Sequence, residues 1–328
     1  MRRTPKRLSI RTPEDFIAVV PYLLGFHPSD SLVALFFDGG RVGLTARIDL
    51  PSPEAIDDLV QDISALGRQS RAGSVVLLAY GADHAGRAVL ERFMTDSPLQ
   101  LLDVLVVGPE RWWSLACPGA CCPPEGTPYD ISAHPLCAEA VLAGMSAAAD
   151  RSALQAMVTG PPPPELDSLA DLAAEAVAEL VGVDRRLRKR RMVTLLRTAL
   201  PCPDVLTDRD CAELAALCLD LPVRDAAWAS MSRREADQHL ALWRRVLSRT
   251  IDELSPGPLG LVAMAGWLSG NGALLNCCID RLERLAPEYT LLQVCRDISW
   301  RAVPPARWDE LSARIPVDPE LLFGSRGR

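Results

Sequence analysis

The stretch from residue 12 to residue 51 constrains the fold more than any other part of the chain, because it combines a helix, a polar loop and a β-hairpin. Three signals mark the helix start: an N-cap hydroxyl at Thr12, a first-turn proline at Pro13 and a first-turn acid at Glu14. Gly25 ends the apolar run that follows. The stretch therefore predicts a helix of about three turns that leads into a polar loop.

Two apolar runs after that loop predict a β-hairpin. They span residues 32–37 and 42–48, and the sequence DGGR between them is typical of a tight turn with positive φ. In a hairpin, the first strand begins beside the end of the second strand. The polar loop residues should therefore face the hairpin's end, with His27, Asp30 and Ser31 opposite Arg47 and Asp49.

Strand-like and helix-like segments then alternate. Residues 53–66 and 85–93 have helical spacing of apolar side chains, whereas residues 74–80 and 101–107 are short apolar runs typical of buried strands. This alternation predicts an α/β unit with a mixed sheet of about five strands, flanking helices, right-handed crossovers and mostly parallel pairing. The second hairpin strand and the two later strands should then end at the same edge.

Polar and aromatic residues gather at that predicted edge, where open α/β sheets bind ligands. An alternative is that they cap helices and form turns, as Asp and Ser often do, and that Trp112 packs beneath a loop. No catalytic residue is assigned. The candidate ligand-binding residues are His27, Asp30, Ser31, Arg47, Asp49, Tyr80, Asp83, His84, Arg111 and Trp112.

Three classes of function fit the sequence. The favoured one is a binding or regulatory protein that holds a small ligand or a partner segment at the strand-end edge, because no phosphate loop or nucleophile motif is present. The second is a hydrolase-type enzyme in which His27 or His84 acts as base, with Asp30, Asp49 or Asp83 orienting it. The third is an interaction scaffold formed by the helical C-terminal part.

A cysteine- and proline-rich loop follows the predicted sheet. Cys117, Cys121, Cys122 and Cys137 are a candidate structural zinc site, but C-x3-C-C lacks the C-x2-C spacing of zinc knuckles. The favoured interpretation is therefore a proline-stiffened loop with buried thiols. No other cofactor is indicated.

Four consecutive prolines at residues 161–164 mark a change in composition. A proline run is excluded from a helix interior, so it predicts a linker. The expected organisation is an α/β domain over residues 1–115, the cysteine- and proline-rich loop with short helices and the linker over residues 116–165, and an all-α domain over residues 166–328.

The helical part contains one dense basic run and one repeat-like segment. The run RRLRKRR at residues 185–191 suits phosphate binding, a solvated helix face or pairing with acids such as Glu175 and Glu179. Residues 261–289 resemble one tetratricopeptide unit, which must pack on neighbouring helices because one helical hairpin cannot bury its own apolar face. Four tryptophans are expected to anchor that packing: Trp228, Trp243, Trp267 and Trp300.

The overall charge and the cysteines limit partners and location. A net charge of −7 argues against binding to nucleic acid or to anionic membranes, and the basic run has no interleaved aromatic residues. No apolar run is long enough to span a membrane. Ten cysteines in a long chain without a predicted leader favour reduced thiols in the cytoplasm. The partner is left open as a protein or a small ligand.

Several separate motifs together resemble a known family. They include RTPEDFIAVVPYLLGFHPSDSLVAL, TARIDLP, RWWSLACPGACCPPEGTPYD, VRDAAWASMSRREADQHLALWRRV and GWLSGNGALLNCCIDRLERLAPEY. The chain is similar over nearly its whole length to the actinobacterial family known as domain of unknown function 4192. That resemblance implies an actinobacterial, cytoplasmic protein and implies no activity.

Overall fold

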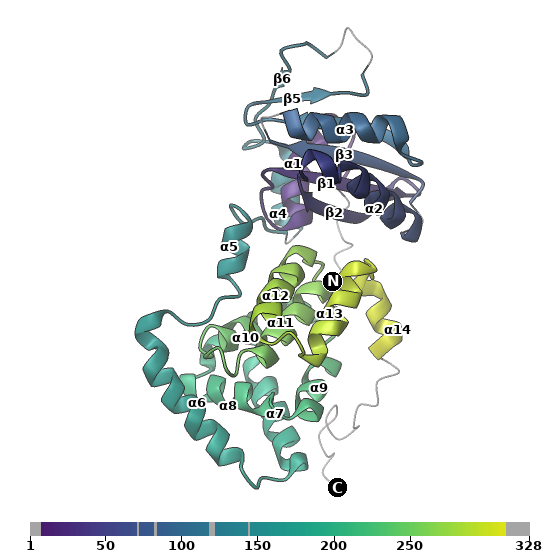
Figure 1. Ribbon diagram of the computed structural model, residues 1–328. Helices are drawn as coiled ribbons and strands as arrows, with labels where there is room; N and C mark the ends of the chain where they lie inside the picture. The colour runs from purple at the N-terminus through teal and green to yellow at the C-terminus, as the bar shows by residue number, and fades with distance from the viewer. Residues whose placement is uncertain (1–7, 71, 82–83, 118–121, 144, 313–328) are drawn as a thin grey trace, which may run out of the picture. The chain divides into compact units, whose positions relative to one another are not determined.

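The computed structural model describes residues 8–70, 72–81, 84–117, 122–143 and 145–312 (Figure 1). Contacts divide the chain into two compact units, residues 1–151 and residues 152–328. Near this boundary, the backbone of Ala148 bonds to Gly25 and His27 of the first unit, whereas Leu154 is buried and belongs to the second.

Within the described residues, the first unit contains a six-stranded mixed sheet with the order β2-β1-β3-β4-β5-β6. β1 pairs antiparallel with both of its neighbours, and only β3 and β4 pair in parallel. The strands are β1 (Ser31–Asp38), β2 (Arg41–Asp49), β3 (Ser74–Tyr80), β4 (Gln100–Val107), β5 (Arg111–Ser114) and β6 (Thr127–Pro128).

The mixed sheet confirms the predicted α/β architecture of this part, but the prediction of mostly parallel pairing is wrong. β1 lies between β2 and β3 and is antiparallel to both. β2 and β3 therefore run in the same direction but are not paired with each other. Gly39 and Gly40 have φ values of 55° and 75° in that turn, as its sequence predicts. β5 is an additional strand, because residues 111–114 are not among the segments predicted as strands.

Helices cover both faces of the sheet (Figure 1). α2 (Ile56–Gln69) and α3 (His84–Asp96) pack on one face, where Ile63 and Phe93 join the core formed by Leu32, Ala34 and Phe36. α1 (Pro13–Leu24) packs with α4 (Pro135–Leu142), and the ring of Phe16 meets that of Phe37 edge-on at 6.2 Å on the other face. Alternate residues of each strand thus face two different layers.

The second unit consists of helices. α11 is its central element, because every residue from Gly257 to Leu268 is buried and the helix contacts α10, α12 and α13. Gly182 has a φ of 75° and separates α6 from α7. The helices are α6 (Leu166–Leu180), α7 (Arg185–Ala199), α8 (Asp208–Leu217), α9 (Leu221–Ala229), α10 (Ala236–Leu247), α11 (Pro256–Leu268), α12 (Gly272–Leu285), α13 (Thr290–Trp300) and α14 (Trp308–Ser312), preceded by α5 (Arg151–Ala156) at the boundary between the units.

Indole packing partly follows the expectation from sequence. Trp243 and Trp267 are buried, whereas Trp300 is 76% exposed, so its predicted anchoring role is wrong. Trp300 ends α13 on the side opposite the buried face formed by Leu291 and Cys295. Trp308 takes the anchoring place instead, with its ring 5.2 Å from that of Trp228 and its indole N–H donating to the carbonyl of Met231.

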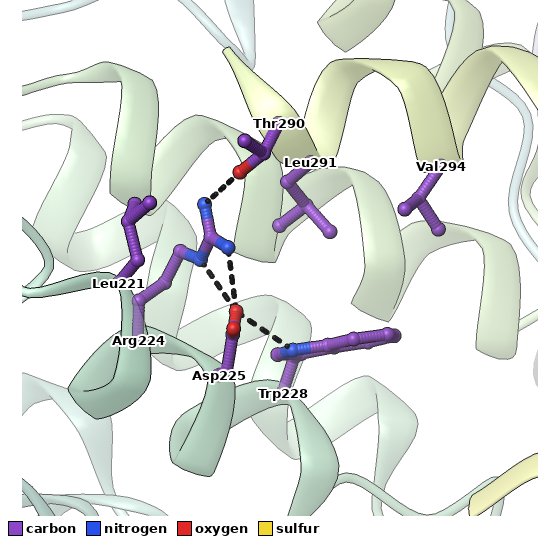
Figure 2. A pocket seen from close by; sticks show the side chains of 7 residues that line it. All are labelled: Leu221, Arg224, Asp225, Trp228, Thr290, Leu291 and Val294. Carbon is purple, nitrogen blue, oxygen red and sulfur yellow. Dashed lines mark hydrogen bonds and ion pairs between the residues drawn. The ribbon is translucent and has the colours of Figure 1, made fainter. Parts of the chain in front are cut away.

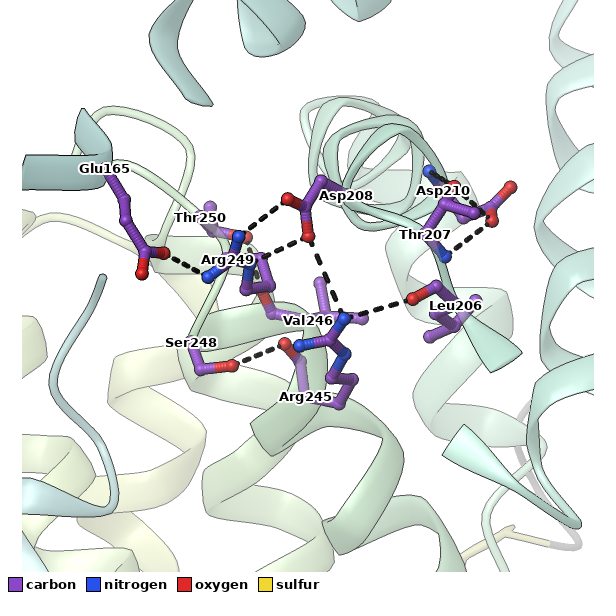
Figure 3. Close-up of polar contacts among 10 residues, drawn as sticks. All are labelled: Glu165, Leu206, Thr207, Asp208, Asp210, Arg245, Val246, Ser248, Arg249 and Thr250. Atoms are coloured by element: carbon purple, nitrogen blue, oxygen red, sulfur yellow. Dashed lines mark hydrogen bonds and ion pairs between the residues drawn. The ribbon is translucent and has the colours of Figure 1, made fainter. Parts of the chain in front are cut away.

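An ion-pair network joins three helix ends in the second unit (Figure 3). Arg249, just after α10, binds both carboxylate oxygens of Asp208 at 2.8 and 2.6 Å and also binds Glu165. Arg245 donates to the carbonyl of Leu206 at 3.2 Å. The guanidinium of Arg249 lowers the pKa of Asp208. The network fixes the entry of α6 and the first turn of α8 beside the end of α10.

The four-proline run lies between two residues that are each hydrogen-bonded or ion-paired to an arginine. Before it, the carbonyl of Val158 accepts a hydrogen bond from Arg281, and after it Glu165 pairs with Arg249. Both partners belong to the second unit. Among the described residues, no helix combines the length and the apolar character needed to span a bilayer.

Candidate functional site

The strand-end edge of the first unit is built by the register of its strands. Ser31 is paired with Asp49 on one side and with Tyr80 on the other. Tyr80 is paired with Val107, and Val107 with Trp112. Residues paired across a sheet share a face, so this row lies on the face that also carries Phe37. Neighbouring strands are roughly 4.8 Å apart, which puts Tyr80 and Trp112 about 10 Å apart at the backbone.

Arg47 organises the β2 end of the row. Its Nε donates to Ser31 Oγ at 2.9 Å, and its Nη2 contacts Asp49 Oδ1 at 2.6 Å. The aromatic ring of Phe26 lies 5.9 Å from the guanidinium carbon, and Arg151 approaches Asp49 at 3.7 Å. The Arg47 side chain is 14% exposed, so its charge is held largely inside the unit.

Ser31 has both of its hydrogen-bonding roles filled. Its hydroxyl donates to the carbonyl of Ser29 and accepts from Arg47, and the residue is fully buried. A nucleophilic serine needs to donate its proton to a base. Ser31 donates instead to a backbone carbonyl, so this geometry stabilises the loop rather than activating the hydroxyl.

The loop before β1 carries local strain. Asp30 has a φ of 45°, in the left-handed region that L-residues other than glycine, asparagine and aspartate seldom enter. Its carbonyl accepts from the amide of Leu50 at 3.0 Å, which ties the loop to the end of β2. The side chains of His27, Ser29 and Asp30 are exposed.

Two buried donors on the same face have no hydrogen-bond partner among the described residues, the hydroxyl of Tyr80 and the indole N–H of Trp112. The residues are 8% and 7% exposed. Burial raises the pKa of Tyr80 well above its ordinary value, and the nearby phenol of Tyr129 adds to this. Tyr129 differs, because its hydroxyl donates to the carbonyl of Gly108 at 2.8 Å.

Among the remaining candidates, Arg111 does not join this cluster. The Arg111 guanidinium donates to the carbonyl of Gly126 at 2.7 Å, and Arg111 alternates with Trp112 along β5, so its side chain leaves by the other face. His84 begins α3, the helix on that other face. Asp83 lies outside the described residues.

Sequence reasoning missed three residues that complete the cluster: Phe26, Tyr129 and Arg151. Phe26 sits next to the predicted His27, and Tyr129 lies in the TPYD motif, but neither has a local signal for its role. Arg151 lies far beyond Asp49 in the sequence, and only folding brings the two together.

The cysteine loop does not show a metal site in the described residues. Cys121 lies outside them, and they contain no group of three or more histidine, cysteine or acidic side chains placed to hold a metal ion. Cys137 lies on α4, where its Sγ contacts the carbonyls of Ala18 and Ile131 at 3.7 and 3.3 Å. The zinc hypothesis stays a prediction.

Part of the basic run forms ion pairs. Arg185 and Arg188 both contact Asp220, at 3.1 and 3.3 Å, and Arg191 approaches Glu213 at 3.8 Å. Glu175 and Glu179, which the sequence offers as alternative partners of this run, pair with Arg209.

Taken together, the sheet and its edge define an α/β protein with a polar, aromatic strand-end cluster and many additional helices. The chain belongs to the family described as a domain of unknown function (DUF4192), whose model matches residues 13–306. The resemblance in the sequence motifs is thus confirmed. No curated protein and no solved structure matches the chain.

Proposed function

We propose that the first unit binds a small, acceptor-rich organic molecule at its strand-end edge, and that the protein acts as a binding or regulatory protein. The ligand would lie across the ends of β1, β3 and β5. Tyr80 and Trp112 would donate hydrogen bonds to it, and Arg47 would flank it at the β2 side.

The observation that carries this proposal is the pair of unpartnered buried donors on one sheet face. Each unsatisfied buried group costs about 1–3 kcal/mol, and such groups in folded proteins usually have a partner. Here the two donors belong to large aromatic side chains on strands separated by β4 alone. A ligand with two acceptors at a matching separation satisfies both at once.

Arg47 supports the same ligand class. Its Nε and Nη2 are used by Ser31, Ser29 and Asp49, whereas Nη1 has no hydrogen-bond partner within the described part of the chain. A guanidinium held by three fixed contacts keeps its remaining donor in a defined direction. That donor suits a carboxylate, phosphate or carbonyl oxygen.

Access to the buried donors requires movement of their cover, and the strained loop at residues 26–30 is the segment we assign to it. Strain at one non-glycine residue is stored where the surrounding structure holds it, often beside ligand sites. Asp30 is such a residue at the edge of this cluster. Binding that relaxes the loop would release part of that strain.

A hydrolase is less well supported. The hydroxyl of Ser31 is used by a carbonyl and by Arg47, and the exposed His27 makes no side-chain hydrogen bond to another described residue. Within the described part of the edge, the expected histidine–aspartate–serine geometry is therefore not assembled. Binding needs only donors in fixed places, which this edge supplies.

The test uses the full chain and a defined panel of small carboxylates, sugar phosphates, nucleotides and keto acids, screened by thermal shift and followed by calorimetric titration. Tyr80→Phe and Trp112→Phe should each weaken binding of a hit about 2- to 10-fold, the value of one neutral hydrogen bond. Tyr80→Phe should not destabilise the unliganded protein, because its hydroxyl has no partner to lose, whereas Trp112→Phe also shrinks a buried ring and should lower stability.

Tyr129→Phe is the matched control. It also removes one hydroxyl at this edge, but that hydroxyl is satisfied by Gly108, so the replacement should lower stability by about 1 kcal/mol and leave affinity unchanged. The proposal fails if no compound stabilises the wild-type chain, or if a hit binds Tyr80→Phe and Trp112→Phe as tightly as wild type.

A further inference from the structure

A hollow lies in the helical unit, remote in sequence from the sheet edge. It has a volume of about 300 Å³ and is lined by residues of α9 and of the first turns of α13 (Figure 2). Apolar side chains of Leu221, Leu291 and Val294 form its walls. The other lining residues are the polar Arg224, Asp225 and Thr290, and the aromatic Trp228.

The carboxylate of Asp225 is fixed from one side. Its Oδ1 accepts from Arg224 Nε at 2.9 Å, from Arg224 Nη2 at 2.5 Å and from the indole N–H of Trp228 at 3.1 Å. Its Oδ2 receives no hydrogen bond from the described residues, and the side chain is 46% exposed. The chain thus presents a carboxylate oxygen that is oriented, unfilled and open to solvent.

The positive partner, Arg224, lines the same hollow but is almost entirely buried. The Arg224 side chain is 4% exposed, its Nη1 donates to Thr290 Oγ1 at 3.2 Å, and its guanidinium lies 5.0 Å from the ring centre of Tyr289. The carboxylate is therefore the solvent-accessible end of this ion pair, with its side chain 46% exposed. An incoming cation meets the carboxylate before it meets the guanidinium.

Trp228 adds a second attraction for a cation. Its indole plane extends across the hollow beneath Leu291 and Val294 (Figure 2). Its ring packs 5.2 Å from that of Trp308, which holds the plane in place. An aromatic face beside a carboxylate favours ammonium groups, and the apolar walls suit an aliphatic stem.

We propose that the hollow between α9 and α13 binds a primary alkylammonium group, with the ammonium on Asp225 Oδ2 and the aliphatic stem against Leu221, Leu291, Val294 and the Trp228 ring. Two sources share this chemistry, a lysine side chain of a peptide and a free aliphatic amine. This site is separate from the strand-end edge and does not depend on the ligand proposed there.

The experiment uses the full chain labelled with 5-fluorotryptophan, and the probe is pentylammonium chloride. The fluorine resonance of Trp228, assigned with Trp228→Phe, should shift saturably with a dissociation constant in the millimolar range, as expected for so small a ligand. Pentanol and pentanoate of equal chain length should bind at least about 10-fold more weakly, the value of one charge-assisted contact.

Leu221→Arg tests whether Asp225 Oδ2 is the acceptor. It keeps Asp225 in place, so the buried Arg224 retains its counter-ion. Leu221 is 39% exposed and lies four residues before Asp225 on α9, so an arginine there pairs with Oδ2 within the helix. Both Leu221→Arg and the matched Leu221→Gln remove the same apolar wall contact, so Leu221→Arg should bind pentylammonium more than about 10-fold more weakly than Leu221→Gln. Thermal unfolding of both variants checks that they fold.

Three results would contradict the alkylammonium site. The proposal is overturned if pentylammonium causes no saturable shift at Trp228, if pentanol binds equally well, or if Leu221→Arg binds as tightly as Leu221→Gln. With the site established, a lysine tripeptide with blocked ends identifies the source: tighter binding than pentylammonium supports a peptide, and weaker binding supports a free amine. None of these measurements depends on Tyr80 or Trp112.

Discussion

At the residue scale, the backbone strain at Asp30 can be measured through its effect on the free energy of unfolding. Its φ of 45° is available to glycine at no steric cost but not to a β-branched side chain. Asp30→Gly should leave the free energy of unfolding unchanged or raise it by up to about 0.5 kcal/mol, and Asp30→Val should lower it by about 1–2 kcal/mol. Denaturant unfolding of the full chain measures both.

Ser29→Val is the control for that pair, since Ser29 is also exposed in the same loop but has no positive φ. It should cost much less than Asp30→Val. Equal stability of Asp30→Gly and Asp30→Val would show that the loop does not hold this residue in the left-handed region, and the loop would then lose its assigned role as the cover of the site.

His239 is a second residue with a measurable consequence. Burial lowers its pKa to about 4, although the nearby Glu235 carboxylate partly offsets this, and its Nδ1 has no partner in the described residues. The unfolded chain, with an ordinary pKa near 6.5, binds the proton more readily. Stability is therefore complete above about pH 6.5 and falls as the pH drops toward 4, by at most about 3 kcal/mol.

His239→Leu should remove this part of the pH dependence. Its free energy of unfolding should be close to that of wild type at neutral pH and less sensitive to acid between about pH 6.5 and 4. The exposed His27→Leu should leave the wild-type slope unchanged. A wild-type slope in His239→Leu would mean that other groups account for acid sensitivity in this range.

At the element scale, the Arg249 network links the start of α6, the first turn of α8 and the end of α10 (Figure 3). A double-mutant cycle of Arg249→Ala and Asp208→Ala should give a coupling free energy of about 1–2 kcal/mol. Two parallel hydrogen bonds to a half-buried carboxylate are stronger than a surface pair. Because Arg249 lowers the pKa of Asp208, the coupling should be present above about pH 4 and lost as the pH falls below it.

Arg209 with Glu175 is the matched exposed pair, with side chains 57% and 60% exposed. Its coupling should be below about 0.5 kcal/mol, because solvent screens it. Equal coupling in the two cycles would mean that the network does not fix the helix ends more strongly than an ordinary surface ion pair.

Helix α1 shows how local signals determine an element. Thr12 and Asp15 form a capping box, with the Asp15 amide donating to Thr12 Oγ1 at 3.2 Å and the Thr12 amide donating to Asp15 Oδ2 at 2.9 Å. At the other end, Gly25 has a φ of 80°. Start, direction and end of this helix follow from residues within one turn of each terminus.

At the scale of the whole molecule, the division at residue 151 predicts that the two units fold separately. Residues 8–151 and residues 152–328, expressed alone, should each unfold cooperatively, because each unit has its own buried core. Circular dichroism during chemical denaturation measures this. A first fragment extended to residue 165 should be no more stable than residues 8–151. The added residues Val158 and Glu165 are held by Arg281 and Arg249, which belong to the second unit.

The contradicting outcome is a second fragment that loses cooperative unfolding when it begins at residue 152 but recovers it when it begins at residue 166. The predicted linker at the four prolines would then be the true boundary. A run of prolines cannot lie in the interior of a helix, so it predicts a segment without regular secondary structure. It does not show which unit binds the two ends of that segment.

The sequence by itself determined the elements whose signals are local. These include the capped helix α1, the DGGR hairpin turn and the short buried strands, because a cap, a turn or a period depends on neighbouring residues only. It also indicated that His27–Ser31 and Arg47–Asp49 lie at one hairpin end, since hairpin register follows from its turn.

Only the tertiary structure decided which side chains share a face and which partners they meet. Strand order depends on contacts between residues far apart in sequence, so β1 lies between β2 and β3, and Ser31 is paired with Tyr80. Alternation along β5 then sends Trp112 to the face of Tyr80 and Arg111 to the other. Trp308 is buried in place of the predicted Trp300 for the same reason: burial depends on the neighbouring helices, which a helix's own sequence does not specify.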